Sequence, residues 1–303
     1  MNISQKLGLK ISGHKDIPFV DVNLYHDTGL FVDPCLIECC NDAFSQKCNI
    51  VISDYFKKLY DVYEKNVRRD IFVHLSHLGE RNEARLGYGN GRNGKAKTAT
   101  GMIETLSGLH CFIRSGWPIE RAIDIPLLMP RFAEDCMSDM LMNILYKLFS
   151  EYTIEQCRKY GISTAHSVRK HHYWNSEEHC WSIYEGESLV VDGTVILLIP
   201  KQYVCRRLHC STEHFFMSKI APLIQKRDAV ILDGKERKPN KDEVKAFECQ
   251  KYGSLQAAVL GHMESNPYLL EDYHMDISKR CLGKCLSDNC LDNIVYGKIK
   301  AAV

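Results

Sequence analysis

The stretch EDCMSDMLMNILYKLFSEYTIEQCRKYG, residues 134–161, decides the fold class of this 303-residue chain. Its apolar residues recur at the spacing of a helix, at Met137, Met140, Leu141, Ile144, Leu145, Leu148, Phe149 and Tyr152. This period predicts one long amphipathic helix from about Glu134 to Tyr160, with the apolar stripe facing the core. Gly161 follows at the predicted end, because glycine readily takes the left-handed conformation that closes a helix.

Strand patterns lie on both sides of this helix. Residues 17–33 predict two short extended segments, and residues 180–200 predict a β-hairpin around the turn Asp192-Gly193. Helical patterns, including one from Asp42, a candidate cap, to about Lys65, outweigh them, which predicts an α+β or α/β fold with a small central sheet, arranged as in restriction endonucleases. The polar segment 233–241 predicts a boundary between a main domain, residues 1–232, and a helical C-terminal region, residues 233–303, packed on it or appended to it.

Charge and hydropathy exclude several classes of protein. The chain has 39 Lys and Arg against 38 Asp and Glu, a net charge of +1, which excludes a uniformly basic or acidic protein. No apolar run approaches the roughly 20 residues that cross a bilayer. The first residues contain no apolar signal segment. We therefore expect a cytoplasmic protein that does not associate with a membrane.

Cysteine is abundant, with 14 residues scattered along the chain. In the absence of a secretory signal, they predict free thiols in a reducing compartment. Two places offer metal-ligand residue types, the C-terminal group and a His/Cys-rich stretch: Cys281, Cys285 and Cys290, and His171, His172, His179, Cys180, Cys205, His209, Cys210 and His214. Neither has the paired knuckles typical of a structural zinc site, so packed thiols are favoured over structural Zn²⁺. The sequence assigns no role to the C-terminal group.

One face of the long helix carries oxygen ligands. Asp135, Asp139 and Asn143 are spaced four residues apart, which places their side chains on one face. Carboxylate and amide oxygens are the ligands that Mg²⁺ prefers, with water and substrate phosphate completing the shell. The simpler alternative is a solvated polar face whose acids meet the positive end of the helix dipole.

A glycine-rich basic segment precedes the helix. The sequence RLGYGNGRNGKAK, residues 85–97, predicts a loop that contacts phosphate or nucleic acid through Gly87 and four cations, Arg85, Arg92, Lys95 and Lys97. It is neither a Walker A loop nor a dinucleotide fingerprint. The alternative is a flexible basic surface loop.

Asp33 and Lys201 extend the acidic helix face into a candidate catalytic site. In nucleases with a PD-(D/E)xK pattern, acids and a lysine on neighbouring strands surround a divalent ion. Lys201 ends a predicted strand, although Ile199 stands where that pattern has an acid. Asp33 ends the strand LFVD and is the further acid we expect. Asp192 is better explained as a hairpin-turn residue.

Four segments together resemble a family of largely uncharacterised bacterial proteins. They are LFVDPCLI (30–37), RLGYGNGRNGK (85–95), DCMSDMLMNILYKLFSEYTIEQCRKYGI (135–162) and the stretch from Tyr173 to Lys201 that ends in DGTVILLIPK. The resemblance covers about residues 17–207 and implies an association with mobile or phage-defence loci. It places six residues within the family's motif segments: Asp33, Asp135, Ser138, Asp139, Asn143 and Lys201.

These observations predict a metal-dependent phosphodiester hydrolase, a nuclease of prokaryotic phage defence. Asp33, Asp135, Asp139 and Asn143 would bind Mg²⁺ or Mn²⁺, and Asp135, Asp139 and Lys201 would be catalytic. A helicase or ATPase is the expected protein partner. The alternative is a non-enzymatic subunit of a defence complex that senses nucleic acid or a partner through the same charged surfaces. A third and weaker reading is a nucleotide-modifying enzyme that takes a dinucleotide at the glycine-rich loop.

Overall fold

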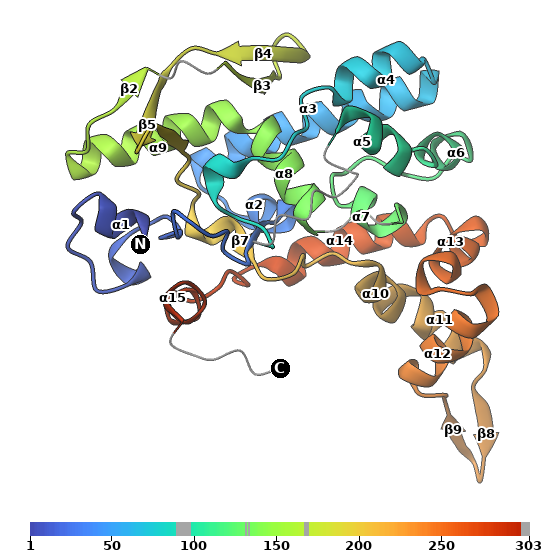
Figure 1. The fold of residues 1–303 in the computed structure, drawn as a ribbon. Coiled ribbons are helices and arrows are strands. Elements are labelled where there is room, and N and C mark those ends of the chain that lie inside the picture. The colour runs from blue at the N-terminus through green and yellow to red at the C-terminus, as the bar shows by residue number, and fades with distance from the viewer. Residues whose placement is uncertain (89–97, 131, 133, 167–169, 298–303) are drawn as a thin grey trace.

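A computed structural model describes residues 1–88, 98–130, 132, 134–166 and 170–297. Helices dominate these residues, and the strands form short antiparallel pairs, so the predicted α+β class is confirmed (Figure 1). The described strands form four small separate sheets, β1–β7, β2–β5–β6, β3–β4 and β8–β9. The restriction-endonuclease-like arrangement therefore stays a prediction.

The helices of the main body surround a single apolar core. They are α1 (Ile3–Lys6), α2 (Pro34–Cys39), α3 (Ala43–Lys65), α4 (Arg68–Leu75), α5 (Ala99–Thr105), α6 (Leu109–Arg114), α7 (Asp124–Leu128), α8 (Glu134–Ile144) and α9 (Tyr146–Tyr160). Short 3-10 turns occur at η1 (His14–Asp16), η2 (Asn82–Ala84) and η4 (Lys201–Tyr203). The predicted 42–65 helix is confirmed as α3, which Asp42 caps by accepting hydrogen bonds from Phe44 N and Ser45 N.

The strands are β1 (Phe31–Val32), β2 (Ala165–His166), β3 (His171–Asn175), β4 (Cys180–Tyr184), β5 (Glu187–Val191), β6 (Thr194–Ile196), β7 (Val204–Cys205), β8 (Val230–Leu232) and β9 (Lys235–Arg237). The predicted 180–200 hairpin is confirmed as β5–β6. Its turn residues have positive φ, 49° at Asp192 and 75° at Gly193, as a type I′ turn requires. Residues 17–24, predicted to be extended, form isolated bridges and no named strand.

The single long helix predicted for residues 134–160 is wrong in one respect. The helix is interrupted at Leu145, where ψ is 11°, and becomes α8 and α9. The hydrogen bonds from Leu145 N to Leu141 O and from Phe149 N to Leu145 O carry the chain through the bend. Neither glycine nor proline stands there, and the structure offers no further reason for the bend. Gly161 ends α9 with φ 67°, as predicted.

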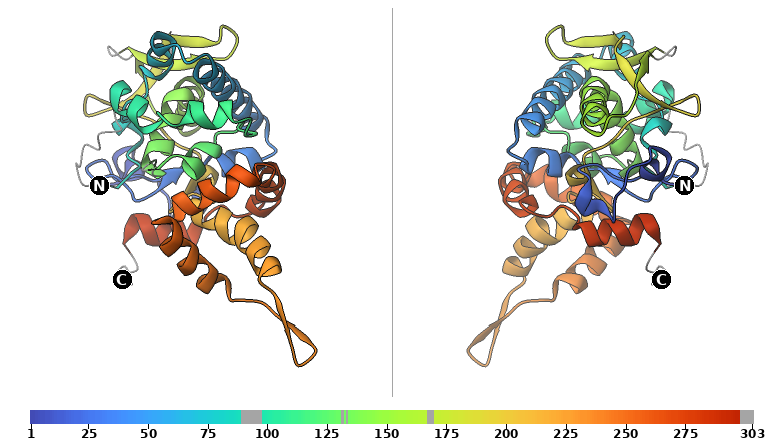
Figure 2. Two further views of the ribbon diagram at one scale, coloured as in Figure 1. Left: turned by 90° about the vertical axis from the view of Figure 1, so that its right-hand side faces the viewer. Right: turned by 90° about the vertical axis from the view of Figure 1, so that its left-hand side faces the viewer.

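The end of the predicted main domain forms α10 (Thr212–Phe215), the π-helical turn η5 (Phe216–Ile220), α11 (Ala221–Arg227) and β8. The described part of the predicted C-terminal region contains β9, α12 (Lys241–Tyr252), α13 (Leu255–Ser265), α14 (Leu269–Cys281) and α15 (Asp288–Tyr296), and its α13 contacts α7. Helix α14 lies against α2, and α15 lies against η1. The polar segment predicted as a boundary contains β9 and the turn of the β8–β9 ribbon, which projects from the body between α11 and α12 (Figure 2).

No helix among the described residues is both long and apolar enough to span a bilayer.

Candidate functional site

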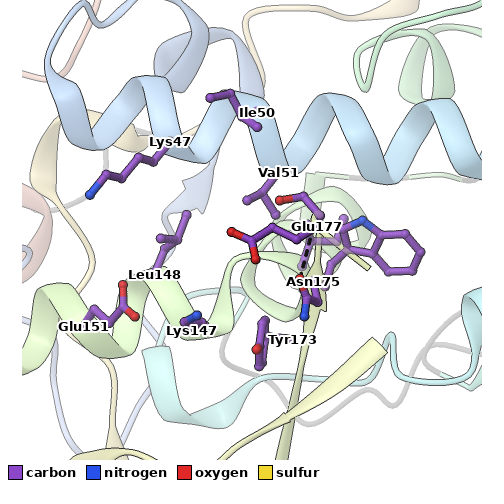
Figure 3. A pocket seen from close by; sticks show the side chains of 12 residues that line it. Lys47, Ile50, Val51, Lys147, Leu148, Glu151, Tyr173, Asn175 and Glu177 are labelled. Carbon is purple, nitrogen blue, oxygen red and sulfur yellow. Dashed lines mark hydrogen bonds between the residues drawn. The ribbon is translucent and has the colours of Figure 1, made fainter. Parts of the chain in front are cut away.

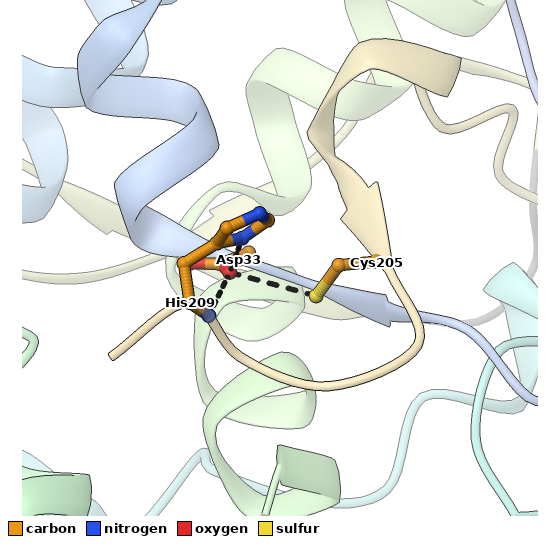
Figure 4. A group of neighbouring side chains, drawn as sticks. All are labelled: Asp33, Cys205 and His209. Carbon is orange, nitrogen blue, oxygen red and sulfur yellow. Dashed lines mark hydrogen bonds and ion pairs between the residues drawn. The ribbon is translucent and has the colours of Figure 1, made fainter. Parts of the chain in front are cut away.

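Asp33, Cys205 and His209 form a compact group beside the core (Figure 4). One carboxylate oxygen of Asp33, Oδ2, accepts hydrogen bonds from His209 N at 2.8 Å and from Cys205 Sγ at 3.5 Å, and it lies 2.7 Å from His209 Nδ1. The Asp33 side chain is completely buried, whereas that of His209 is 20% exposed. Solvent therefore reaches this group from the histidine side.

Local chain geometry assembles the group. Asp33 follows β1 and caps α2, where its Oδ1 accepts from Cys35 N at 2.8 Å. Strand β7 pairs antiparallel with β1, with Phe31 opposite Cys205. This register places the Cys205 thiol next to the Asp33 carboxylate. Val32 N donates to Ser138 Oγ at 3.0 Å, which joins β1 to α8. The strand and the predicted acidic helix thus contact each other.

The thiol of Cys205 is held in its neutral form. Burial raises its pKa well above the ordinary value, and the neighbouring carboxylate of Asp33 raises it further. It therefore does not supply a thiolate nucleophile at neutral pH. A divalent cation bound at the sulfur would favour the thiolate over the neutral thiol, because a coordinated thiol loses its proton.

The group has the dimensions of a metal centre. One ligand atom from each side chain, a carboxylate oxygen, a sulfur and an imidazole nitrogen, lies within 4.8 Å of the other two. Over the described part of the chain, no other set of three His, Cys, Asp or Glu side chains meets this criterion. Cys281 is buried, and Cys285 and Cys290 are exposed, so the C-terminal cysteines do not gather into a comparable set.

A pocket of about 460 Å³ adjoins this group and receives the start of the glycine-rich segment. Its lining includes Tyr88, Glu134 and Arg207, together with Leu208 and Cys210 on either side of His209. Tyr88 donates to Glu134 Oε2 at 3.2 Å, and its ring lies 4.6 Å from that of Phe31 in β1. None of the three side chains of the Asp33 group lines the pocket itself, and the pocket is next to the group through the chain neighbours of His209.

Gly87 brings a second predicted acid to the same region. Its N–H donates to Thr28 O and Leu30 O, both at 3.1 Å, and its φ is 128°. A Cβ at this position would lie 2.9 Å from Asp135 Oδ1. Glycine is therefore needed both for the backbone conformation and for the close approach of Asp135. The structure therefore places Asp135 next to Gly87, and the predicted phosphate and metal roles of the two residues stay predictions.

Asp139 and Asn143 face a different segment, residues 79–81. Arg81 N donates to Asp139 Oδ1 at 3.3 Å, and Asn143 Nδ2 donates to Gly79 O at 2.6 Å. Asn143 Oδ1 is buried and has no hydrogen-bond partner among the described residues. The guanidinium of Arg81 continues this network to His171 Nδ1 at 3.2 Å, beside a pocket of about 500 Å³. Asp139 and Asn143 therefore bind residues 79–81, the part of the chain that leads into the glycine-rich segment.

The side chain of Lys201 contacts α15 and His14 rather than the acids of the predicted site. Its Nζ lies 2.6 Å from Asp288 Oδ1 in α15 and 2.5 Å from His14 O. None of the acids predicted to share its site is among these partners. Arg85, another predicted cation, has φ 52° and accepts a hydrogen bond from Thr28 N at its carbonyl oxygen. The other predicted cations of that loop, Arg92, Lys95 and Lys97, lie outside the described residues.

A third pocket, of about 390 Å³, lies between α3, α9 and the β3–β4 hairpin (Figure 3). Its charged lining is balanced, with Lys47 and Lys147 against Glu151 and Glu177. Lys147 Nζ lies 5.3 Å from the centre of the Tyr173 ring, so that cation already has an aromatic partner. None of the residues predicted to carry chemistry lines this pocket.

Sequence reasoning did not select Cys205 and His209 as site residues. Both belong to the His/Cys-rich stretch that was considered for metal binding, and their types and four-residue spacing were the available signal. Their third partner, Asp33, is 172 and 176 positions away in the chain. Spacing therefore could not reveal that the three side chains meet.

The fold and this group define a helix-rich α+β protein with a buried carboxylate–thiol–imidazole centre. Residues 8–211 match the model of a family described as Domain of unknown function (DUF8370), so the chain belongs to this family. The matched span includes Asp33, Cys205 and His209. No curated protein and no solved structure matches the chain.

Proposed function

We propose that this protein is a divalent-metal-dependent phosphodiester hydrolase that acts on nucleic acid, with its metal centre at Asp33, Cys205 and His209. The observation that carries the proposal is the approach of three different donor atoms within 4.8 Å in one partly accessible place. The adjoining pocket with Arg207, at the start of the glycine-rich segment, supplies a place for a phosphate. A role in prokaryotic phage defence belongs to the proposal through the family resemblance.

The donor set changes the ion that we expect. Mg²⁺ takes oxygen ligands, whereas a thiol and an imidazole favour Zn²⁺ among the common divalent ions. Three protein ligands with an open fourth position are typical of catalytic zinc rather than structural zinc. We therefore propose Zn²⁺ first, with Mn²⁺ and Mg²⁺ as the comparison ions in any assay.

The chain's own groups have distinct tasks in this proposal. An ion at the centre would supply a water of lowered pKa for attack on phosphorus. Arg207 would stabilise negative charge on the phosphate, and Glu134 would take the proton that the attacking water loses and pass it to the departing oxygen when the P–O bond breaks. Asp135 lies close to Gly87, and Lys201 pairs with Asp288 and so connects α15 to the main body.

Replacing Asp33 by asparagine or His209 by alanine is expected to lower the affinity for Zn²⁺ by at least about 100-fold, because the first change replaces a charged carboxylate ligand by a neutral amide and the second removes the imidazole ligand. Cleavage of a labelled oligonucleotide should fall in parallel. The measurements are metal content after dialysis, titration with Zn²⁺, Mn²⁺ and Mg²⁺, and cleavage of single- and double-stranded DNA and RNA.

His179→Ala is the matched control, since His179 also lies 2.6 Å from a carboxylate, that of Asp54, but outside the pocket. It should bind metal and cleave as the unmodified protein does. Equal metal binding by all variants would contradict the proposal that Asp33, Cys205 and His209 form a metal centre. Metal binding without cleavage of any substrate would contradict the hydrolase and favour the non-enzymatic binding subunit, whose helicase or ATPase partner could then be sought by coexpression.

A further inference from the structure

The β8–β9 ribbon projects from one end of the molecule (Figure 2), and its strand β8 has exposed aliphatic side chains. Val230, Ile231 and Leu232 are 53%, 78% and 51% exposed. The strands are paired only with each other, and no other described strand extends this sheet. A two-stranded ribbon with no packing partner is marginally stable in water. Val230 and Leu232 lie on one face of the ribbon and Ile231 on the other, so aliphatic side chains are exposed on both faces.

The two outer edges of the ribbon differ. Strand β9 is Lys235-Glu236-Arg237, and lysine and arginine on an edge strand oppose pairing with another chain. Strand β8 is Val230-Ile231-Leu232 and carries no charge within the strand. Its outer backbone groups are therefore the unprotected edge.

We propose that β8 pairs with β8 of a second copy of this chain, to form a four-stranded antiparallel sheet with the order β9–β8–β8–β9. A two-fold axis would pass beside Ile231, so that Ile231 faces its own copy and Val230 faces Leu232 on both sides. Each of these cross-strand pairs joins one aliphatic side chain to another, without a charge.

The cross-strand register supports this arrangement. Within one ribbon Val230 is opposite Arg237, Leu232 is opposite Lys235, and Ile231 is opposite Glu236. In the four-stranded sheet one face would hold four central aliphatic residues with basic side chains on both flanks. The other face would hold the two Ile231 side chains between the two Glu236 side chains. The charged groups stay at the rim, where they remain hydrated.

The projection of the ribbon makes the pairing sterically accessible. The turn at Asp233 and Gly234, with φ 51° and 71°, lies at the tip, and the helical body lies at the other end (Figure 1). Two ribbons can therefore pair side by side with opposite directions while the bodies stay apart. Because the strands are short, the buried area is small and the dimer is of the weak, reversible class.

Sedimentation velocity tests the proposal over protein concentrations from about 1 to about 200 μM, the range of a weak interface. The mass is expected to rise with concentration from 34.8 kDa towards twice that value. Ile231→Lys places two like charges at the symmetry axis and should remain monomeric at every concentration. Ile183→Lys in the β3–β4 hairpin is the control, because Ile183 is also an exposed strand isoleucine, at 41%.

A charge-pairing experiment separates pairing from misfolding. Ile231→Glu alone should also remain monomeric, but an equal mixture of Ile231→Lys and Ile231→Glu should form a heterodimer, since opposite charges then face each other. A monomeric unmodified protein at all concentrations would overturn the proposal. So would an Ile231→Lys dimer of unchanged strength, or a mixture that stays monomeric.

Discussion

Replacing Asp124 by alanine is expected to lower the free energy of unfolding by about 3–5 kcal/mol, the range for breaking a fully buried polar network. Asp124 is completely buried at the start of α7. Its Oδ2 accepts from Glu120 N at 2.9 Å and Arg121 N at 2.8 Å, and its Oδ1 lies 2.6 Å from His274 Nε2 in α14. The substitution removes the acceptor of two part-buried backbone N–H groups and of the buried His274 ring.

Chemical denaturation followed by tryptophan fluorescence measures this loss. Asp276→Ala is the matched control, because Asp276 lies on the same helix as His274 and pairs with Lys219 at 2.7 Å, but its side chain is 66% exposed. Exposed pairs contribute about 0–1 kcal/mol, so the control should change stability little. Losses of equal size in the two variants would show that the buried contact between α7 and α14 has no special role.

The second large effect is a loss of stability in acid. His74 contributes to this loss, and the substitution His74→Phe is expected to remove that contribution. Burial lowers the pKa of His74 to about 3, from an ordinary value near 6.5. The ring is packed between Tyr55 and Trp174, with centroid distances of 4.4 Å and 4.7 Å, and its Nε2 has no hydrogen-bond partner among the described residues. An imidazolium cation is therefore strongly disfavoured in the folded state.

The sign of the effect follows from proton uptake. Because the pKa of His74 is lower in the folded state, the unfolded chain binds an extra proton as the pH falls from 6.5 towards 3, and stability is lost in that window. Between about pH 6.5 and about pH 4 the contribution of this group amounts to about 3 kcal/mol. Phenylalanine fills the same aromatic site and does not titrate, so the variant should lose less stability over this interval.

The measurement is the free energy of unfolding of both proteins at a series of pH values. Part of the acid sensitivity should persist in His74→Phe, because burial also lowers the pKa of His214, to about 4. His110→Phe, at a half-buried position in α6, is the control and should keep the full pH dependence. Parallel curves for the unmodified protein and His74→Phe would contradict the burial argument.

Much of the local structure followed from residue patterns, and the candidate site followed only in part. The helix α3, the end of α9 at Gly161 and the β5–β6 turn were all predicted, because each depends on neighbours a few residues apart. The predicted roles of Asp33 as a metal ligand and of Gly87 in phosphate binding stay predictions, although the structure shows that Asp33 caps a helix after a strand and that Gly87 lies close to Asp135. The bend at Leu145 had no local signal.

The distribution of the predicted acids was decided by tertiary contacts. Asp135 and Asp139 share one face of α8, as the spacing required, yet Asp135 lies against Gly87 while Asp139 accepts a hydrogen bond from Arg81. Two different loops cross that face, and sequence spacing contains no information about which loop passes where. Lys201 likewise pairs with Asp288, which is 87 positions later in the chain.

From the sequence alone came the α+β class, the hairpin and the balanced charge, because composition and short-range periodicity are properties of neighbouring residues. Only the folded chain brought Asp33 to Cys205 and His209, through the pairing of β1 with β7, and only it left β8 exposed at the end of a projecting ribbon. Both outcomes depend on which distant surfaces bury one another, and that is settled by packing of the whole core rather than by any single segment.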